Sequence, residues 1–239
     1  MKKNKTVIIT GCNGSIGSHL INYFKKKNYK IIGIDKKKVN DKSIIFYLCD
    51  LNNTKKLEKI YKEIKRKYQF ANCLINCAGL IHNELMIKFD NGFKTHSILN
   101  WKNVIENNIN ITFYNTKFFI DNFSNQKTPN QLIINFSSTN ANGVIGQSAY
   151  STSKVAIETA TKVWSKELSI YKIRVTCISP GYINLDSTIK NISQKEKNNI
   201  INQIPSGRFG KIKEIISGIN FIINNKYFNG KVLKIDGGK

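Results

Sequence analysis

Short apolar segments rich in β-branched residues alternate with amphipathic segments along the chain. The apolar segments fall at 6–10, 30–35, 43–48, 72–79, 132–136, 173–178 and 231–236. Segments with helical spacing of their apolar residues separate most of them, including 54–67, 148–170 and 212–224. Strands that alternate with helices form parallel sheets whose crossovers cover both faces. We therefore predict an α/β fold in a single domain spanning 1–239. Its centre is a doubly wound parallel sheet of about seven strands, with helices on both faces.

The first apolar segment leads directly into a glycine-rich turn, GCNGSIG at 11–17, and a helix follows. Glycine permits a tight turn and a close approach of the backbone to a diphosphate, and a helix N-terminus favours phosphate charge. A strand, a glycine turn and a helix in this order indicate a dinucleotide-binding site. The contacts expected from this turn are Gly11, Asn13, Ser15, Ile16 and Gly17.

Asp35 ends the second predicted strand, 18 residues after Gly17. An acid at about this distance binds a ribose 2′-hydroxyl, and its charge repels a 2′-phosphate. The sequence therefore favours NAD over NADP, although the three lysines at 36–38 could attract that phosphate. Alternatively, Asp35 is only a turn residue at the end of a strand. Asp50, followed by Leu51, either reaches the adenine or caps the next helix.

Two further segments place small residues and an amide near this predicted site. The fourth strand ends in an Asn-x-Ala-Gly turn at 76–79, whose small residues would let the backbone lie against the cofactor. Asn108 falls inside a helix predicted to begin at Trp101, although Asn lowers helix propensity. It either orders water near Lys154, or it is one more Asn in an Asn-rich chain.

The segment 132–154 is the candidate for chemistry. A buried strand delivers Ser137 and Ser138 to its carboxyl end, where open α/β sheets bind ligands. Tyr150 and Lys154 follow on a helix, and residues four apart share a helix face. A tyrosine titrates near about 10, and a neighbouring cation favours its phenolate. With a serine to hold a carbonyl or carbinol oxygen, this group outlines a carbonyl–alcohol redox site. By itself Tyr-x-x-x-Lys is a common exposed pair, so the prediction depends on the other motifs.

The formal charge of +23 invites a nucleic-acid partner. The basic residues are nearly all lysines spread along the chain, however, which indicates a compositional bias on a solvated surface, so no nucleic acid is expected. Five cysteines without a C-x-x-C pair predict a reduced, cytoplasmic protein with no metal site. No apolar run of about 18 residues occurs, so no membrane span is expected. The short apolar run at the N-terminus is broken almost at once, unlike that of a secretory signal.

Together these motifs resemble the short-chain dehydrogenase/reductase family in its compact, single-domain form, over nearly the whole chain. The motifs are TGCNGSIG, Asp35, Asp50, NCAG, Asn108, the Ser138–Tyr150–Lys154 set, SPG at 179–181, IPSGRFG and VLKIDGG. The C-terminal half is similar to 3-oxoacyl-carrier-protein reductases and to sugar or polyol dehydrogenases. The resemblance implies a Rossmann-like fold and an NAD(P)-dependent oxidoreductase that interconverts a secondary alcohol and a ketone.

The resemblance also implies residue roles. Tyr150 would donate or accept the proton, and Lys154 would lower its pKa and hold the nicotinamide ribose. Ser138 would bind the reacting oxygen, and Asn108 would order a proton-relay water. The remaining cofactor contacts are expected at Leu51, Asn76, Ala78, Gly79, Pro180, Gly181 and Ile183.

The partners implied are a small-molecule or carrier-bound substrate and further copies of the chain. A homotetramer or homodimer would form through the helices around 100–125 and 148–170. The long segment 182–205, which ends at Ile204 and Pro205, is predicted to be a substrate loop or lid.

Three positions depart from the family pattern. The glycine turn has the spacing of the family's longer members. Ser138 lies 12 residues before Tyr150, one fewer than usual, so Ser137 is kept in reserve. Leu185 stands near the place of a threonine that touches the cofactor. Two alternatives stay open: an NADPH-dependent 3-oxoacyl-carrier-protein reductase, and a non-catalytic nucleotide- or RNA-binding regulator on the same fold.

Overall fold

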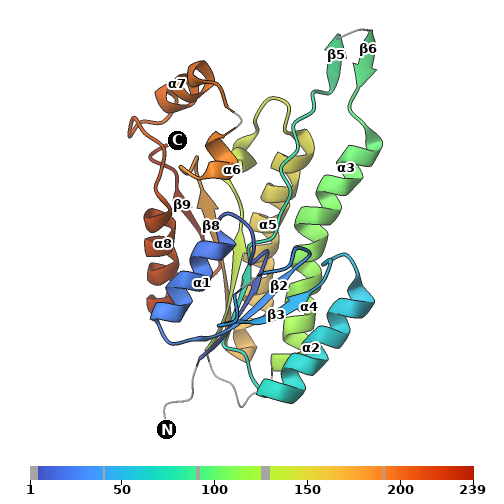
Figure 1. Ribbon diagram of the computed structural model, residues 1–239, viewed down its shortest axis with the longest axis vertical. Helices are drawn as coiled ribbons and strands as arrows, with labels where there is room; N and C mark the ends of the chain where they lie inside the picture. Colours follow the sequence, from blue (N-terminus) through green and yellow to red (C-terminus); the bar gives the residue numbers. More distant parts are fainter. Residues whose placement is uncertain (1–4, 40, 90–91, 125–129, 191) are drawn as a thin grey trace.

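A seven-stranded parallel sheet forms the centre of the computed structural model (Figure 1), which describes residues 5–39, 41–89, 92–124, 130–190 and 192–239. The strand order is β3-β2-β1-β4-β7-β8-β9. The predicted fold class and strand number are confirmed. The strands are β1 (Thr6–Thr10), β2 (Lys30–Asp35), β3 (Ile45–Leu48), β4 (Cys73–Asn76), β7 (Gln131–Phe136), β8 (Ile173–Pro180) and β9 (Val232–Ile235).

Helices cover both faces of this sheet, and alternate residues of one strand point into the two layers. In β1, Val7 and Ile9 join a core with helices α1 and α8, whereas Ile8 joins the core on the opposite face with α2 and α4. Burial on both faces explains why the central strands are unbroken apolar runs. These helices are α1 (Gly17–Lys26), α8 (Ile212–Asn224), α2 (Thr54–Tyr68), α4 (Ile111–Phe123) and α5 (Ser148–Glu167).

The helix predicted from Trp101 onward is interrupted at Asn108. Helix α3 (Ile98–Ile105) passes into a π-helical turn, η1 (Glu106–Asn110), and then into α4. Short π segments inside α-helices occur frequently at functional sites. The remaining short elements are two 3₁₀ turns, η2 (Thr139–Asn142) and η3 (Ser169–Tyr171).

Between β4 and α3 the chain forms a hairpin that the sequence did not predict. Strands β5 (Ile87–Phe89) and β6 (Phe93–Thr95) pair antiparallel and project away from the central sheet (Figure 1). Both strands are exposed along their length. A strand without a buried face lacks the apolar alternation from which strands are recognised.

The segment predicted to be a loop or lid contains two helices, α6 (Asp186–Ile189) and α7 (Gln194–Asn202). A capping box formed by Ser193 and Glu196 begins α7. In the described part of the chain, no helix is both long and apolar enough to span a bilayer.

Candidate active site

A cleft of about 980 Å³ lies at the carboxyl ends of the central strands. Its walls come from the glycine turn, the ends of β2, β4, β7 and β8, the start of α5 and the segment before α6. The strand order reverses between β1 and β4, the position at which open α/β sheets bind ligands. The tertiary structure therefore brings the separate sequence motifs to one place.

The glycine turn lies against the end of β4. Gly11 has a φ of +64°, which favours glycine, and a Cβ there would stand 2.7 Å from the Cα of Ala78. A Cβ at Gly17 would overlap the carbonyl oxygen of Gly11. Residues 13–15 are exposed, and they line the cleft. The N–H groups of Asn13 and Gly14 donate within the protein, to Asp35 Oδ2 and Gly11 O, so the turn is a closely packed unit whose exposed edge faces the cleft.

Asp35 fixes the end of β2 to this turn. Its carboxylate accepts the backbone N–H of Asn13 at 2.9 Å and that of Lys37 at 2.9 Å, and it lines the cleft. A carboxylate oxygen has further lone pairs for a ribose hydroxyl. Lys36 and Lys37 also line the cleft. The cleft therefore contains both the carboxylate that would repel a 2′-phosphate and lysines that could attract one.

Asp50 and Leu51 line the cleft as well, but Asp50 does not cap α2. Its Oδ1 accepts the N–H of Asn52 at 3.0 Å in a local turn. Asn53 caps the helix instead, accepting the N–H of Lys56 at 3.0 Å. The capping alternative for Asp50 is therefore wrong, because the helix begins three residues later than that role requires.

Two predicted asparagines are buried and have structural partners, and neither lines the cleft. Asn76 donates to Thr116 Oγ1 at 3.1 Å and to Asn135 Oδ1 at 2.9 Å, which joins β4 to α4 and β7. Its side chain therefore lies beneath the cleft floor. The Asn-x-Ala-Gly pattern predicts the turn, but it does not specify the hydrogen-bond partners of the Asn76 side chain.

Asn108 is fully buried in the π-helical turn. Its Nδ2 donates to Leu80 O at 2.9 Å and Val104 O at 3.0 Å, and its Oδ1 accepts the N–H of Leu80 at 3.1 Å. A Cβ at Gly79 would stand 2.8 Å from this Oδ1 and 3.4 Å from Lys154 Nζ. The amide is thus close to Lys154 and holds the Gly79–Leu80 backbone in place. Both Nδ2 hydrogens are used, whereas Oδ1 has a second lone pair, so its role in ordering water stays a prediction.

Ser138, Tyr150 and Lys154 meet in the cleft as predicted from their spacing. The Ser138 hydroxyl lies near enough to Tyr150 to lower the pKa of the phenol, and both residues line the cleft. Lys154 Nζ donates to Phe136 O at 3.0 Å and lies 5.5 Å from the centroid of the Tyr150 ring. Ser137 has a different partner, because its hydroxyl donates to Glu158 Oε1 at 2.7 Å. The structure therefore favours Ser138 over Ser137 as the serine that faces the reacting group.

Burial controls the titration of this group. It raises the pKa of Tyr150, against the opposing hydrogen bond from Ser138, and it lowers the pKa of Lys154 to about 8. Both side chains are removed from water, which disfavours the charged form of each and has the largest effect on both pKa values. The lowering of the Tyr150 pKa by Lys154 stays a prediction.

The opposite wall of the cleft comes from the segment after β8. Pro180, Gly181, Ile183 and Leu185 line it. Three lining residues near Tyr150 were not predicted: Asn140, Gln147 and Tyr182. They follow strand ends, so a search of the residues after β7 and β8 would have found them.

No group of three or more His, Cys, Asp or Glu is arranged for a metal ion within the described ranges. All five cysteines are free, and four of them are buried.

The cleft and its side chains define a class: a nucleotide-binding α/β protein with groups placed for proton transfer. The family described as short chain dehydrogenase matches residues 5–197. The chain therefore belongs to the short-chain dehydrogenase family of oxidoreductases.

Known proteins resemble the chain over almost its full length. A 3-oxoacyl-[acyl-carrier-protein] reductase of Thermotoga maritima is 28% identical, with 99% of this chain and 98% of that protein covered. One from Buchnera aphidicola is 31% identical over 100% of this chain and 98% of that protein. A solved short chain dehydrogenase from Leptospira borgpetersenii with bound NAD+ has a TM-score of 0.88 at 25% identity, covering 99% of this chain and 92% of that chain.

Proposed function

We propose that the protein transfers hydride between NAD(H) and a secondary alcohol or ketone, with Tyr150 as the general acid and base. The observation that carries this proposal is that Ser138, Tyr150 and Lys154 line the same cleft as the glycine turn and Asp35, with Lys154 Nζ 5.5 Å from the centroid of the Tyr150 ring. The substrate is a small or carrier-bound compound that reaches this end of the cleft.

Each side chain of the group has a distinct task in the proposed reaction. Ser138 donates a hydrogen bond to the carbonyl oxygen and orients it beside the phenol. The Tyr150 hydroxyl gives a proton to that oxygen during reduction and takes it back during oxidation. Lys154, which is held by Phe136 O, places positive charge beside the phenol. NAD(H), when bound, supplies or accepts the hydride.

The residues around the glycine turn fit NAD. The glycine turn, with Gly11, Gly17 and the exposed residues 13–15, would lie against the diphosphate, and the Asp35 carboxylate would accept a ribose hydroxyl. The bound NAD+ of the Leptospira protein supports the same assignment. Ala78, Gly79, Pro180, Gly181 and Ile183 would complete the contacts.

A second candidate, an NADPH-dependent 3-oxoacyl-carrier-protein reductase, is favoured by the names of the Thermotoga and Buchnera relatives. The 36–38 lysines could accept the 2′-phosphate of NADPH. Titration of the protein with NADH and NADPH separates the candidates. A clear preference for NADPH would reject the hypothesis that Asp35 binds the ribose hydroxyl and repels a 2′-phosphate.

The protein is further proposed to form a homodimer or homotetramer through α4 and α5. Phe113, Val155 and Val163 support this assembly because they expose between 45% and 47% of their surface on these helices. Light scattering measures the mass in solution, and a monomer would reject the proposal.

Tyr150→Phe tests the chemistry directly. The variant should lose about 10²- to 10⁴-fold in turnover, the usual contribution of a positioned acid or base, with unchanged affinity for NADH. Tyr182→Phe is the matched control, because Tyr182 also lines the cleft but has no proposed proton to transfer. Retained turnover in Tyr150→Phe would reject the proton-donor assignment.

A further inference from the structure

Tyr182 lines the active-site cleft from the segment after β8. Burial raises the pKa of Tyr150, and the phenol of Tyr182 adds to that rise, which places the two side chains near each other. Within the described ranges the Tyr182 hydroxyl has no hydrogen-bond partner. The neighbours of its ring therefore decide where this side chain lies in the cleft.

Phe209 and Lys239 contact the Tyr182 ring. The Phe209 ring meets it edge-on, with the two ring centroids 6.4 Å apart. The ammonium of Lys239 lies over the ring, 4.3 Å from its centroid. A cation within about 6 Å of an aromatic centroid is attracted to the negative face of the ring. Lys239 therefore gives the Tyr182 ring a preferred position.

Backbone hydrogen bonds hold the two segments that carry Tyr182 and Lys239. The Gly210 N–H donates to Tyr182 O at 2.9 Å, and the Ser206 N–H donates to Gly237 O at 3.0 Å. Gly237 has a φ of +72°, and a Cβ there would collide with Ser206 Oγ. The residues that follow β9 are thus packed closely against the chain after α7, and the Lys239 side chain reaches the ring from this anchored segment.

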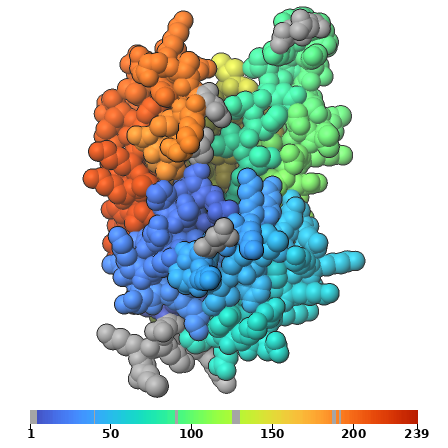
Figure 2. Space-filling view, in the orientation of Figure 1, coloured from blue at the N-terminus to red at the C-terminus, as the bar shows by residue number. Residues whose placement is uncertain are grey.

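Lys239 also lies beside the end of α7. Its Nζ is 3.5 Å from Oε1 of Gln203, the residue that follows the last turn of this helix. A Cβ at Gly238 would stand 3.3 Å from the ring of Pro205, so the two segments touch along this edge. Figure 2 shows the α6–α7 segment, in orange, at the upper edge of the molecule, across from the β5–β6 hairpin. The ammonium of Lys239 therefore connects Tyr182 to the segment predicted to cover the substrate.

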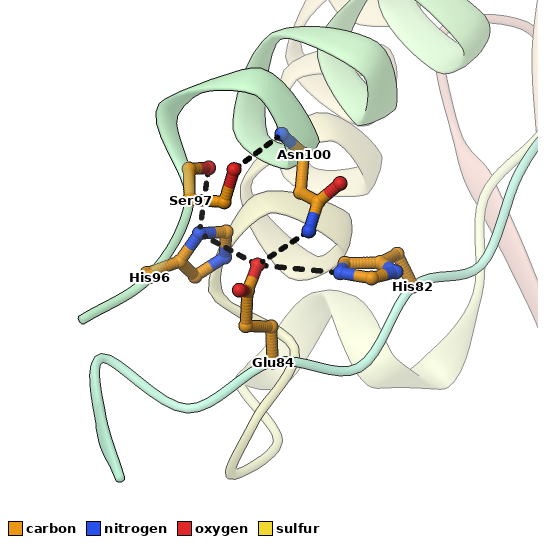
Figure 3. Close-up of polar contacts among 5 residues, drawn as sticks. All are labelled: His82, Glu84, His96, Ser97 and Asn100. Atoms are coloured by element: carbon orange, nitrogen blue, oxygen red, sulfur yellow. Dashed lines mark hydrogen bonds and ion pairs between the residues drawn. The ribbon is translucent and has the colours of Figure 1, made fainter. Parts of the chain in front are cut away.

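A second rim of the cleft is held by a separate network around Glu84 (Figure 3). Its Oε2 lies 3.2 Å from His96 Nδ1 and accepts the amide of Asn100 at 3.1 Å. The Glu84 N–H donates to Gly146 O at 2.7 Å, next to Gln147, which lines the cleft. These bonds fix the 145–147 loop from its own side, so the loss of the Lys239 ammonium should leave this rim in place.

We propose that Lys239 is a positioning residue, whose ammonium holds the Tyr182 ring as a wall of the cleft and connects that ring to α7. This inference rests on the proposed function, because it places Tyr182 beside a carbonyl or alcohol group that reacts at Tyr150. Loss of the ammonium should release the ring and weaken the fit of the substrate. Proton transfer at Tyr150 and the binding of NADH should stay unchanged, because Lys239 does not line the cleft.

The first test follows the ring itself and needs no substrate. Protein labelled with 3-fluorotyrosine gives a fluorine resonance for Tyr182, which is assigned by its loss in Tyr182→Phe. Lys239→Met keeps the length of the side chain but removes the charge, so the resonance should become narrower as the ring moves more freely. Lys239→Arg supplies another cation for the ring and should restore the line width. An unchanged line width in Lys239→Met would overturn the proposal.

The second test measures the consequence for a substrate, with ethyl acetoacetate as a small ketone that NADH reduces. A cation–π contact at an exposed site contributes about two- to fivefold. KM should rise by about that factor in Lys239→Met, with kcat and the Kd for NADH unchanged, and Lys239→Arg should recover the original KM. The matched control is Lys226→Met, which removes the same charge from an exposed position after α8, outside the cleft, and should leave KM unchanged.

A double-variant cycle with Tyr182→Leu shows whether the lysine acts through the ring, because residues in contact have non-additive effects. Lys239→Met should no longer raise KM once the ring is gone. The same rise in the Tyr182→Leu background would overturn the proposal, and so would an unchanged KM in Lys239→Met. If the unaltered protein does not reduce the ketone, the proposed function is rejected for this substrate, whereas the Tyr182 line width still confirms or overturns the hold of Lys239 on the ring.

Discussion

Replacing Asn108 by alanine distinguishes a positioning role from a merely structural one. The change removes three hydrogen bonds, to Leu80 N–H, Leu80 O and Val104 O, from a fully buried site. Asn115 provides a matched control in α4, the helix that follows the π-helical turn. It is also fully buried, donates to the carbonyl of Ile111 four residues earlier, and accepts the hydroxyl of Tyr61.

The two substitutions should destabilise the protein by similar amounts. A buried partner left without its hydrogen bond costs about 1–3 kcal/mol, and part of the Leu80 backbone can be reached by water. We expect about 3 kcal/mol for each variant, which corresponds to a decrease of about 6–12 °C in Tm for a chain of this size. Urea denaturation and thermal melting measure this loss.

Only Asn108→Ala should also impair turnover. Asn108 holds the Gly79–Leu80 backbone, and both of these residues line the active-site cleft close to Lys154. A displacement of about 1 Å there can cost about 10²-fold in kcat/KM. The assay is steady-state kinetics at a temperature at which both variants are folded. Equal kcat/KM values for Asn108→Ala and Asn115→Ala would refute the positioning role.

Two more predictions concern the cofactor and the buried lysine. Asp35→Ala should weaken NADH binding and relax discrimination against NADPH, because the carboxylate that would repel a 2′-phosphate is gone. Titrations with both cofactors measure this, and an unchanged preference would mean that another residue contacts the ribose hydroxyl. Folded Lys154 titrates at a pKa of about 8, below the ordinary value of 10.5. Between these pH values the unfolded chain binds more protons, so the free energy of unfolding should rise with pH by up to about 1.4 kcal/mol per unit from this group. Urea denaturation at pH 8, 9 and 10 measures the free energy of unfolding, and Lys154→Met should lack that rise with pH. The same increase per pH unit in both proteins would contradict the burial of the charge.

Local sequence patterns were sufficient to predict the sheet and the grouping of Ser138, Tyr150 and Lys154 in one cleft. Alternating apolar and amphipathic segments depend on neighbours in the chain, and so does the spacing of Tyr150 and Lys154 on one helix face. The carboxyl ends of parallel strands meet at one edge, so motifs that follow strands could be assigned to one cleft.

Only the tertiary structure decided which polar side chains contact one another across the fold. The Ser137 hydroxyl donates to Glu158, whereas the adjacent Ser138 lies near the Tyr150 phenol. Asn76 and Asn108 become buried, because the elements packed around them supply their hydrogen-bond partners.

The β5–β6 hairpin is the clearest case. Its two strands have no buried face, and the cavity beside it is completed by Gln147, more than fifty residues away in the sequence. The sequence by itself determined the fold class and the motifs that line the cleft, because these follow from periodicity and strand order. The partners of each polar side chain, and the cavity beside the cleft, depend on how separate loops pack together, which no local pattern encodes.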